Sequence, residues 1–328
     1  MHDYRPTVFP LRSGTPELRM YRAHDADEHA MNLSRWNQTY DQLSPGAFSG
    51  LVTELWLPKT QVFVETANQK LRQSCAAWSD SIWFGIPSPR SELMSLGGKE
   101  LAAEAVCVRQ SGADFELHTA PNFNLYGIVV DRETFGHYLE TVEHYSLDNL
   151  LGPHDVVHLP LAMKASVCRD IGYILADAGH SSGETTRLLQ ERIFVTLTRM
   201  LTAATPQPLR HASTRLQRQR TVEQLRELIL AHPDTPVSIP DLCQRLHLSR
   251  RALQNSVEDI TGLAPVAFMR ALRLNAVRRQ LRDKPGPVGD AAYAWGFSHL
   301  SQFAQDYRKL FGILPSETVV RGENDSIY

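Results

Sequence analysis

Residues 238–265, SIPDLCQRLHLSRRALQNSVEDITGLAP, and residues 287–315, PVGDAAYAWGFSHLSQFAQDYRKLFGILP, carry one pattern twice. The matched pairs, 49 or 50 positions apart, are Asp241 and Asp290, Leu248 and Phe297, Ser249 and Ser298, Leu253 and Phe303, Val257 and Tyr307, Gly262 and Gly312, and Pro265 and Pro315. A repeat of this length indicates that one supersecondary unit is built twice, with one residue inserted where the second helix of the second copy begins.

Each copy is expected to form a helix, a tight turn and a second helix. Ser238, with Asp241 three positions later, resembles a capping box for the first helix. Ser249 is a favourable N-cap for the second helix, as is Ser298 in the second copy. Gly262 follows that helix where a residue with positive φ is needed.

The second helix of each copy has a polar face that suits DNA. Arg can bind guanine, and Asn or Gln can bind adenine, through paired hydrogen bonds in the major groove. The expected base-reading residues are Arg250, Arg251, Gln254, Asn255, His299, Ser301, Gln302 and Gln305. The expected phosphate contacts are Ser249, Arg273, Arg278, Ser298 and Arg308, with helix packing as the alternative role of Arg273 and Arg278. A solvated helix face is the alternative for the polar stripes, but two copies joined by an Arg-rich helix favour DNA.

Composition and charge place this function in the C-terminal part. The 328 residues suggest two domains, and the net charge of −2 hides an asymmetry. Residues 206–328 hold 17 Lys and Arg against 12 Asp and Glu, whereas residues 1–205 hold 17 against 24. Positive charge therefore gathers where phosphate binding would need it. The four cysteines form no CxxC pair, so reduced thiols in a cytoplasmic protein are expected rather than a metal site.

The N-terminal part is expected to be a β-sandwich or cupin-like barrel with helices, which makes the whole chain α+β. Residues 50–130 contain seven short segments that are rich in β-branched and aromatic residues and are separated by turn residues. Residues 133–203 have helical periodicity and could cover the sheet or form a homodimer contact. The expected division is a sensing domain at 1–204, a linker at 205–214 and a DNA-binding domain at 215–328.

Two further local patterns lead to expectations. Residues 1–30 are polar and Pro-containing, and they are expected to form a loose arm whose HDADEH cluster at 24–29 is solvated. Neither a signal peptide nor a membrane span is expected. Thr221, with Gln224 three positions later, resembles a capping box that would open a helix. The arginines of the helix that joins the two repeats are expected to face outward, and they are Arg270, Arg273, Arg278, Arg279 and Arg282.

The tandem pattern resembles the DNA-binding domain of the AraC/XylS transcription regulators. The resemblance is carried by DLCQRLHLSRRALQNSVEDITGLAPVAFMRALRLNAVRRQL and DAAYAWGFSHLSQFAQDYRKLFGILPSE, and it covers about the last 110 residues. It implies a sequence-specific activator that binds double-stranded promoter DNA in the nucleoid, has RNA polymerase as a partner and responds to a small-molecule effector.

The N-terminal part is similar to a narrower group, the regulators of bacterial ethanolamine-utilisation operons. The segments that carry this likeness are YDQLSPGAFSG, LRQSCAAWSDSIWFGIPSPR and GADFELHT, together with SRRALQN, RLNAVRR and WGFSHLSQFAQDY. The likeness implies ethanolamine and adenosylcobalamin as effectors. The alternative is a regulator of another catabolic operon with a different effector.

Ethanolamine is a small cation with one hydroxyl, so its site needs an aromatic face or a carboxylate and a hydroxyl partner. The expected effector-binding residues are Arg72, Trp78, Trp83 and Glu116, and plain core packing is the alternative for the aromatic rings. Adenosylcobalamin would need a second surface. No catalytic residues are expected. A metal-dependent cupin enzyme is the competing class, but His118 stands alone on its strand beside Glu116, without the second histidine that such sites use.

Overall fold

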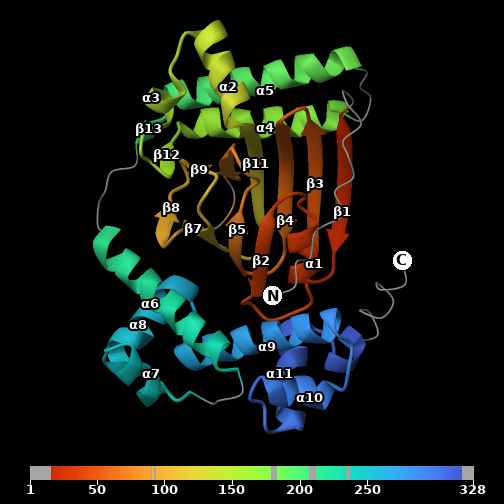
Figure 1. Cartoon of the computed structure of the whole chain (residues 1–328), viewed down its shortest axis with the longest axis vertical. Coiled ribbons are helices and arrows are strands. Elements are labelled where there is room, and N and C mark those ends of the chain that lie inside the picture. The colour runs from red at the N-terminus through yellow and green to blue at the C-terminus, as the bar shows by residue number, and fades with distance from the viewer. Residues whose placement is uncertain are drawn as a thin grey trace.

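The computed structural model describes residues 16–89, 91, 94–178, 183–206, 212–233 and 237–319. Strands and covering helices occupy one end of the molecule, and helices α6 to α11 lie together at the other end (Figure 1). This is the expected α+β architecture, with an N-terminal β-domain followed by an all-α helix-turn-helix domain.

Antiparallel sheets build the N-terminal domain. The larger sheet has, in spatial order, β1 (Glu17–Ala23), β3 (Gly50–Leu57), β4 (Thr60–Ala67), β11 (Phe123–Asp131), β6 (Ser81–Pro87), β9 (Ala105–Gln110), β12 (Val156–His158) and β13 (Thr205–Pro206). The smaller sheet has β2 (Asn37–Gln42), β5 (Leu71–Ala76), β10 (Phe115–Thr119), β7 (Met94–Leu96) and β8 (Lys99–Leu101). All seven strands expected in residues 50–130 are present.

Side-chain alternation gives the larger sheet two buried faces, as β6 illustrates. Ile82 and Phe84 belong to the core cluster that contains the covering helices, whereas Trp83 belongs to the cluster between the two sheets. The helices on the outer face are α2 (Arg132–Tyr138), η1 (Leu139–Glu143), α3 (Leu147–Leu151), α4 (Leu161–Ala178) and α5 (Gly183–Ala203). The described residues between 133 and 203 are thus largely helical, as expected, and they pack against the sheet, which was one of the two roles considered for them.

The prediction of a loose, solvated arm at residues 1–30 is wrong for residues 16–30, and residues 1–15 lie outside the described part. Strand β1 pairs with β3, and α1 (Ala26–Met31) follows with Asp25 as its N-cap. Within the HDADEH cluster, Asp27 and His29 are buried. Desolvating such groups is costly unless they are paired, so both side chains need partners elsewhere in the chain.

The C-terminal domain contains the predicted repeat. Its helices are α6 (Ala212–Ala231), α7 (Ile239–Arg245), α8 (Arg250–Thr261), α9 (Pro265–Asp283), α10 (Val288–Ala294) and α11 (Leu300–Phe311). The capping box of Ser238 and Asp241 is present, Ser249 caps α8, and Gly262 has a φ of 69°. The second helices of the two units, α8 and α11, begin at Arg250 and Leu300, which are 50 positions apart. This spacing agrees with the one residue inserted where the second helix of the second copy begins.

Two cap predictions fail in this domain. Thr221 lies inside α6, where its hydroxyl donates to the carbonyl of Gln217, so it does not open a helix. His299, not Ser298, is the N-cap of α11, and no side chain caps that end. In the expected linker, Thr205–Pro206 pairs with β12 and α6 begins at Ala212; residues 207–211 are outside the described part.

Candidate nucleic-acid interface and the contact between the domains

Helices α8 and α11 each present a polar face to solvent. All eight residues expected to read bases are exposed, whereas Leu253 of α8 and Phe303 of α11 are buried in the domain core. In α8, Gln254 donates to Glu258, and in α11 Gln302 donates to Asp306 at the same spacing. These polar side chains are therefore accessible from solvent on both helices.

The expected phosphate contacts divide into two groups. Ser249, Ser298 and Arg308 are exposed. Arg273 is half-buried on α9, and burial lowers the pKa of its guanidinium. Arg278 is 4% exposed, lies 3.3 Å from Asp25 and packs over the ring of Phe311. The prediction that Arg278 contacts phosphate is therefore wrong for this arrangement. The contacts of Arg278 fit the alternative, a role in helix packing.

The outward orientation expected for the other arginines at the end of α9 is also wrong. Arg279 donates to Asp41 at 2.8 Å and to Asp27 at 3.1 Å, and Arg282 lies 3.7 Å from Asp25. The partners belong to α1 and β2 of the N-terminal domain. The acidic residues that were expected in a solvated tail therefore hold the helix that joins the two helix-turn-helix units.

Burial and pairing act in opposite directions on these carboxyl groups. Burial disfavours the ionised form of Asp41, but Arg279, Arg72 and Arg226 outweigh it and lower the pKa. At Asp27 burial dominates over the attraction of Arg279 and raises the pKa to about 6. The contact between the domains therefore contains one carboxyl group that titrates near neutral pH.

Neutral contacts extend the same interface. The main-chain amide of Gln42 donates to Asn275 Oδ1, and Asn275 Nδ2 donates to the carbonyl of Gln42. Gln42 Nε2 also donates to the carbonyl of Leu310 at 2.6 Å. Leu43 is buried in the core cluster of the C-terminal domain. Both hydrogen bonding and apolar packing thus join the β2 end of the N-terminal domain to α9 and α11.

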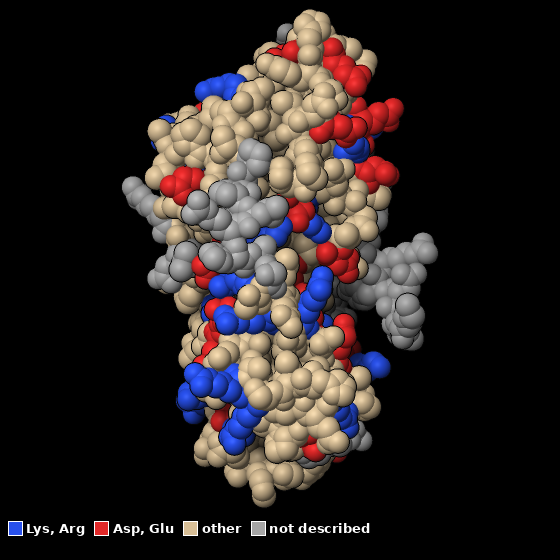
Figure 2. Space-filling model, turned by 90° about the vertical axis from the view of Figure 1, so that its left-hand side faces the viewer, with Lys and Arg blue, Asp and Glu red and all other residues tan. Residues whose placement is uncertain are grey.

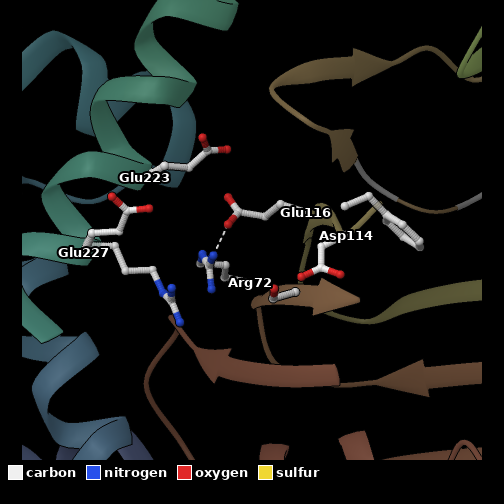
Figure 3. Close-up of a pocket in the computed structure, with 8 residues that line it drawn as sticks. Arg72, Asp114, Glu116, Glu223 and Glu227 are labelled. Carbon is white, nitrogen blue, oxygen red and sulfur yellow. Dashed lines mark ion pairs between the residues drawn. The ribbon is translucent and has the colours of Figure 1, made fainter. Parts of the chain in front are cut away.

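A pocket of about 270 Å³ lies beside these contacts, between the smaller sheet and α6 (Figure 3). Arg72 on β5 forms an ion pair with Glu116 on β10, and Gln219 on α6 donates to Glu116 at 2.6 Å. Arg72 also lies 3.4 Å from Asp41. Arg72 therefore links Glu116 in the pocket to Asp41, which is the carboxylate that binds Arg279.

The four expected effector residues do not form one site. Arg72 and Glu116 both line the pocket. Trp83 is 1% exposed and stacks on Phe115 with ring centroids 4.7 Å apart, so it is part of the core between the sheets. Trp78 donates from Nε1 to Gln61 and is not among the residues that line the pocket. For Trp83, plain core packing is what the structure shows.

His118 does not belong to a metal site that the structure can identify. It is buried, and burial together with Arg72 and Lys70 lowers its pKa to about 3. Within the residues that the structure describes, no group of three or more His, Cys, Asp or Glu side chains is arranged to hold a metal ion. Among the described helices, none has the length and apolar character needed to cross a membrane.

The surface charge follows the division of the chain. Figure 2, which views the molecule from the side of α6, α7 and α8, shows Lys and Arg gathered over the lower half and much of the acidic surface over the upper half. This distribution agrees with the excess of basic residues in residues 206–328. Positive potential over the helical domain would attract a polyanion to it.

Comparison with known proteins identifies the same region. A family model described as a helix-turn-helix domain matches residues 242–321. A probable thc operon regulatory protein of Rhodococcus erythropolis is 31% identical over 90 residues, which are 26% of this chain and 27% of that protein. The XylDLEGF operon transcriptional activator of Pseudomonas putida is 35% identical over 86 residues, 25% of this chain and 27% of that protein. The chain thus spans about a quarter of the length of these curated relatives.

Solved structures are also similar to part of the chain. A probable AraC family transcriptional regulator from Rhodopseudomonas palustris is 36% identical, with a TM-score of 0.29 over 31% of this chain and 97% of that one.

The sequence did not reveal the residues of the domain contact. Asp25, Asp27 and Asp41 carry no local pattern that distinguishes them from solvated acids. The only signal was an unusual density of charge in two segments, the 24–29 cluster and the Arg-rich helix, with opposite signs.

Proposed function

We propose that this protein is a transcription activator of the AraC/XylS type that binds promoter DNA; the match of a helix-turn-helix family model to residues 242–321 and the likeness to the XylDLEGF operon activator support this. One observation carries the proposal. Helices α8 and α11 occupy equivalent places in the two repeats, and each exposes Arg, Gln, His or Ser on the face opposite to the domain core. Such side chains read base edges in the major groove.

The tandem arrangement implies a bipartite site. Recognition helices of paired units enter the major groove about one helical turn, roughly 34 Å, apart. Helix α8 would then read one half of the site and α11 the other. Ser249, Ser298 and Arg308 at the helix margins would bind phosphates and set the register.

Base-specific binding can be tested one half-site at a time. The DNA sequence that the full chain prefers is first obtained by selection from a random duplex library. Arg251→Ala or Gln254→Ala should then cost about 1–3 kcal/mol and relax preference in one half only. Gln302→Ala or Gln305→Ala should do the same in the other half.

Gln224→Ala, an exposed change on α6, is the matched control and should leave both halves unchanged. The base-reading assignment fails if the four variants weaken binding equally for every sequence, or if each relaxes both halves. Binding by gel shift at fixed salt gives the affinities, because the electrostatic part of binding changes with ionic strength.

For the effector we propose ethanolamine together with adenosylcobalamin, and hence the ethanolamine-utilisation genes as targets. Support comes from the likeness of residues 40–50, 71–90 and 112–119 to regulators of those operons. Calorimetry of the full chain with each compound alone and with both together tests it. Binding of neither compound would contradict this choice and favour another catabolic operon with a different effector.

The proposal also includes RNA polymerase as a partner, a cytoplasmic location and a homodimer. An activator of this type contacts RNA polymerase at the promoter, works in the cytoplasm on nucleoid DNA, and could pair through α4 and α5 as a homodimer. Exposed apolar side chains on these helices, Tyr173, Leu188 and Val195, give such a contact a physical basis. Sedimentation of the full chain over a range of concentrations tests the dimer.

A further inference from the structure

The C-terminal ends of the two reading helices, α8 and α11, both lie against the N-terminal domain. Gly262 ends α8 and Gly312 ends α11, and the two glycines are equivalent positions of the repeat. A Cβ added to Gly262 would lie 2.8 Å from Lys70 Nζ, and one added to Gly312 would lie 2.8 Å from the main-chain nitrogen of Ala47. Equivalent points of the two helix-turn-helix units therefore contact the same domain.

Both contact residues belong to one hydrogen-bonded block, which is formed by residues 42–47 and 68–70 and is called the docking block. The main-chain amide of Leu43 donates to the carbonyl of Lys70 at 2.9 Å, and the amide of Lys70 donates to Ser44 Oγ at 2.7 Å. The two side-chain amides of the second segment donate to the first segment. The segments lie at adjacent ends of β2 and β5, which pair with each other, so the smaller sheet anchors the docking block.

The docking block also binds carbonyl groups at the end of α11. The main-chain amide of Gly46 donates to the carbonyls of Lys309 and Leu310, at 3.2 and 3.1 Å. Gln42 Nε2 donates to the carbonyl of Leu310 at 2.6 Å. Carbonyls in the last turn of a helix have no partner within the helix, so donors from elsewhere satisfy them. Gln42 is buried, and its Oε1 has no hydrogen-bond partner among the described residues, so the side chain acts here as a donor.

The same domain holds α9, the helix that joins the two units. In its middle, Asn275 exchanges two hydrogen bonds with the main chain of Gln42, in the docking block. Its C-terminal end is held by the ion pairs to Asp25, Asp27 and Asp41. Figure 1 shows α9 running along the end of the N-terminal domain at which β2 lies. Helices α8, α9 and α11 therefore share one support.

Docking leaves the base-reading faces open. The contacts with the docking block are at the last turn of each reading helix, whereas the residues expected to read bases lie nearer the N-terminal ends, within 250–255 and 299–305. All of those residues are exposed in the docked arrangement. Both reading faces are therefore free for DNA while the other ends of the helices are held.

We infer that the docking block sets the spacing between the two half-sites that the protein reads, with Gln42 and Lys70 as positioning residues. The inference rests on the proposed function, because it requires α8 and α11 to read separate half-sites. Two helices on one support have one separation and one relative rotation. Each base pair inserted between the half-sites changes both, by about 3.4 Å and roughly 35°. Residues outside the DNA-binding domain thereby determine which spacing fits.

Gel shift of the full chain on duplexes that differ only in half-site spacing tests the inference. The preferred duplex from the library selection is lengthened or shortened between its halves by one or two base pairs. Wild-type protein should bind these duplexes about tenfold more weakly, because one half no longer fits its reading helix. Gln42→Met removes the N–H donors at similar side-chain length, and Lys70→Met removes the charge beside Gly262. Each should reduce the tenfold difference to about threefold, as the loss of contacts of this strength allows.

A duplex that carries one half-site alone provides the second readout. Both variants should bind it as the wild type does, because the sequence of the DNA-binding domain is unchanged. Asn37→Ala, an exposed change on β2, is the matched control and should keep the wild-type dependence on spacing. Equal weakening at every spacing and on the single half-site would mean that the docking block only stabilises the fold, and would overturn the inference.

The outcomes separate this inference from the proposed function. A wild-type dependence on spacing in both Gln42→Met and Lys70→Met would overturn the inference, and selection of a bipartite sequence by the wild type would still support the activator. Lys70→Met alone decides if Gln42→Met does not fold, as judged by its melting temperature. A wild-type protein without sequence preference would overturn the proposed function and this inference with it.

Discussion

Replacing Asp27 by Asn is expected to change the free energy of unfolding, relative to wild type, more favourably at neutral pH than at acidic pH. Burial raises the pKa of Asp27 from 3.8 to about 6, even though Arg279 and Arg282 lower it. The folded protein therefore holds this proton more tightly than the unfolded chain. The stability that protonated Asp27 contributes is fully present below about pH 4 and is lost as pH rises through about 6.

The magnitude follows from the size of the shift. About two pKa units at roughly 1.4 kcal/mol per unit make about 3 kcal/mol over the whole range. Roughly 1 kcal/mol of this falls between pH 5 and pH 7. The Asn side chain does not titrate, and its Oδ1 can still accept from Arg279, which lies 3.1 Å from Asp27. The difference in unfolding free energy, Asp27→Asn variant minus wild type, should therefore grow by about 1 kcal/mol from pH 5 to pH 7.

Urea denaturation followed by circular dichroism at pH 5, 6 and 7 measures this difference. Asp80→Asn is the control, because Asp80 is exposed and its φ of 59° is one that Asn also adopts readily. The control should show no such trend. A difference for Asp27→Asn that is constant with pH, or larger at pH 5, would refute the conclusion that this carboxyl group is buried at the contact between the domains.

Further substitutions test the docked arrangement and its relation to DNA binding. Arg278→Met should lower the melting temperature by leaving the half-buried carboxylate of Asp25 without its nearest guanidinium, at a cost of about 1–3 kcal/mol. Arg308→Met, on the exposed side of α11, should leave the melting temperature unchanged and reduce the salt slope of DNA binding by about one, measured by gel shift over a series of salt concentrations. Gly312→Ala should destabilise the protein by about 1–3 kcal/mol, because its φ is 75° and a Cβ would lie 2.8 Å from the amide nitrogen of Ala47. Gly286→Ala is the control, because a Cβ there meets no atom closer than 3.8 Å, and it should not destabilise the protein. Equal melting temperatures for the two variants would contradict the close approach of Gly312 to Ala47.

The predictions that succeeded depended on local chemistry. Ser238, Ser249 and Gly262 act within one turn of the helix they begin or end, so neighbouring residues suffice to place them. The strands between residues 50 and 130 were recognisable from their composition and turn residues. The repeat itself identified the helix-turn-helix units without any knowledge of packing.

The failures came from local patterns that tertiary contacts override. Thr221 and Gln224 match a capping box, yet α6 runs through them from Ala212, because the apolar face beside Thr221 packs into the domain core. Asp27 looks solvated in the sequence because its partner, Arg279, is 252 positions away. Trp83 suits a cation by its chemistry, but only the packing of Phe115 against it reveals that the ring has no open face toward a ligand.

The sharing of one ion-pair cluster between the start and the end of the chain has a consequence for synthesis. Asp25, Asp27 and Asp41 are made early, whereas Arg278, Arg279 and Arg282 leave the ribosome only after some 250 further residues. Domains tend to fold in the order in which they emerge. A nascent N-terminal domain must therefore fold before Asp25 and Asp27 gain their arginine partners, and the burial of α1 is completed only when α9 is present. A chain truncated before residue 278 should keep its sandwich but expose Asp25 and Asp27 to solvent, because the arginines that pair with them are missing.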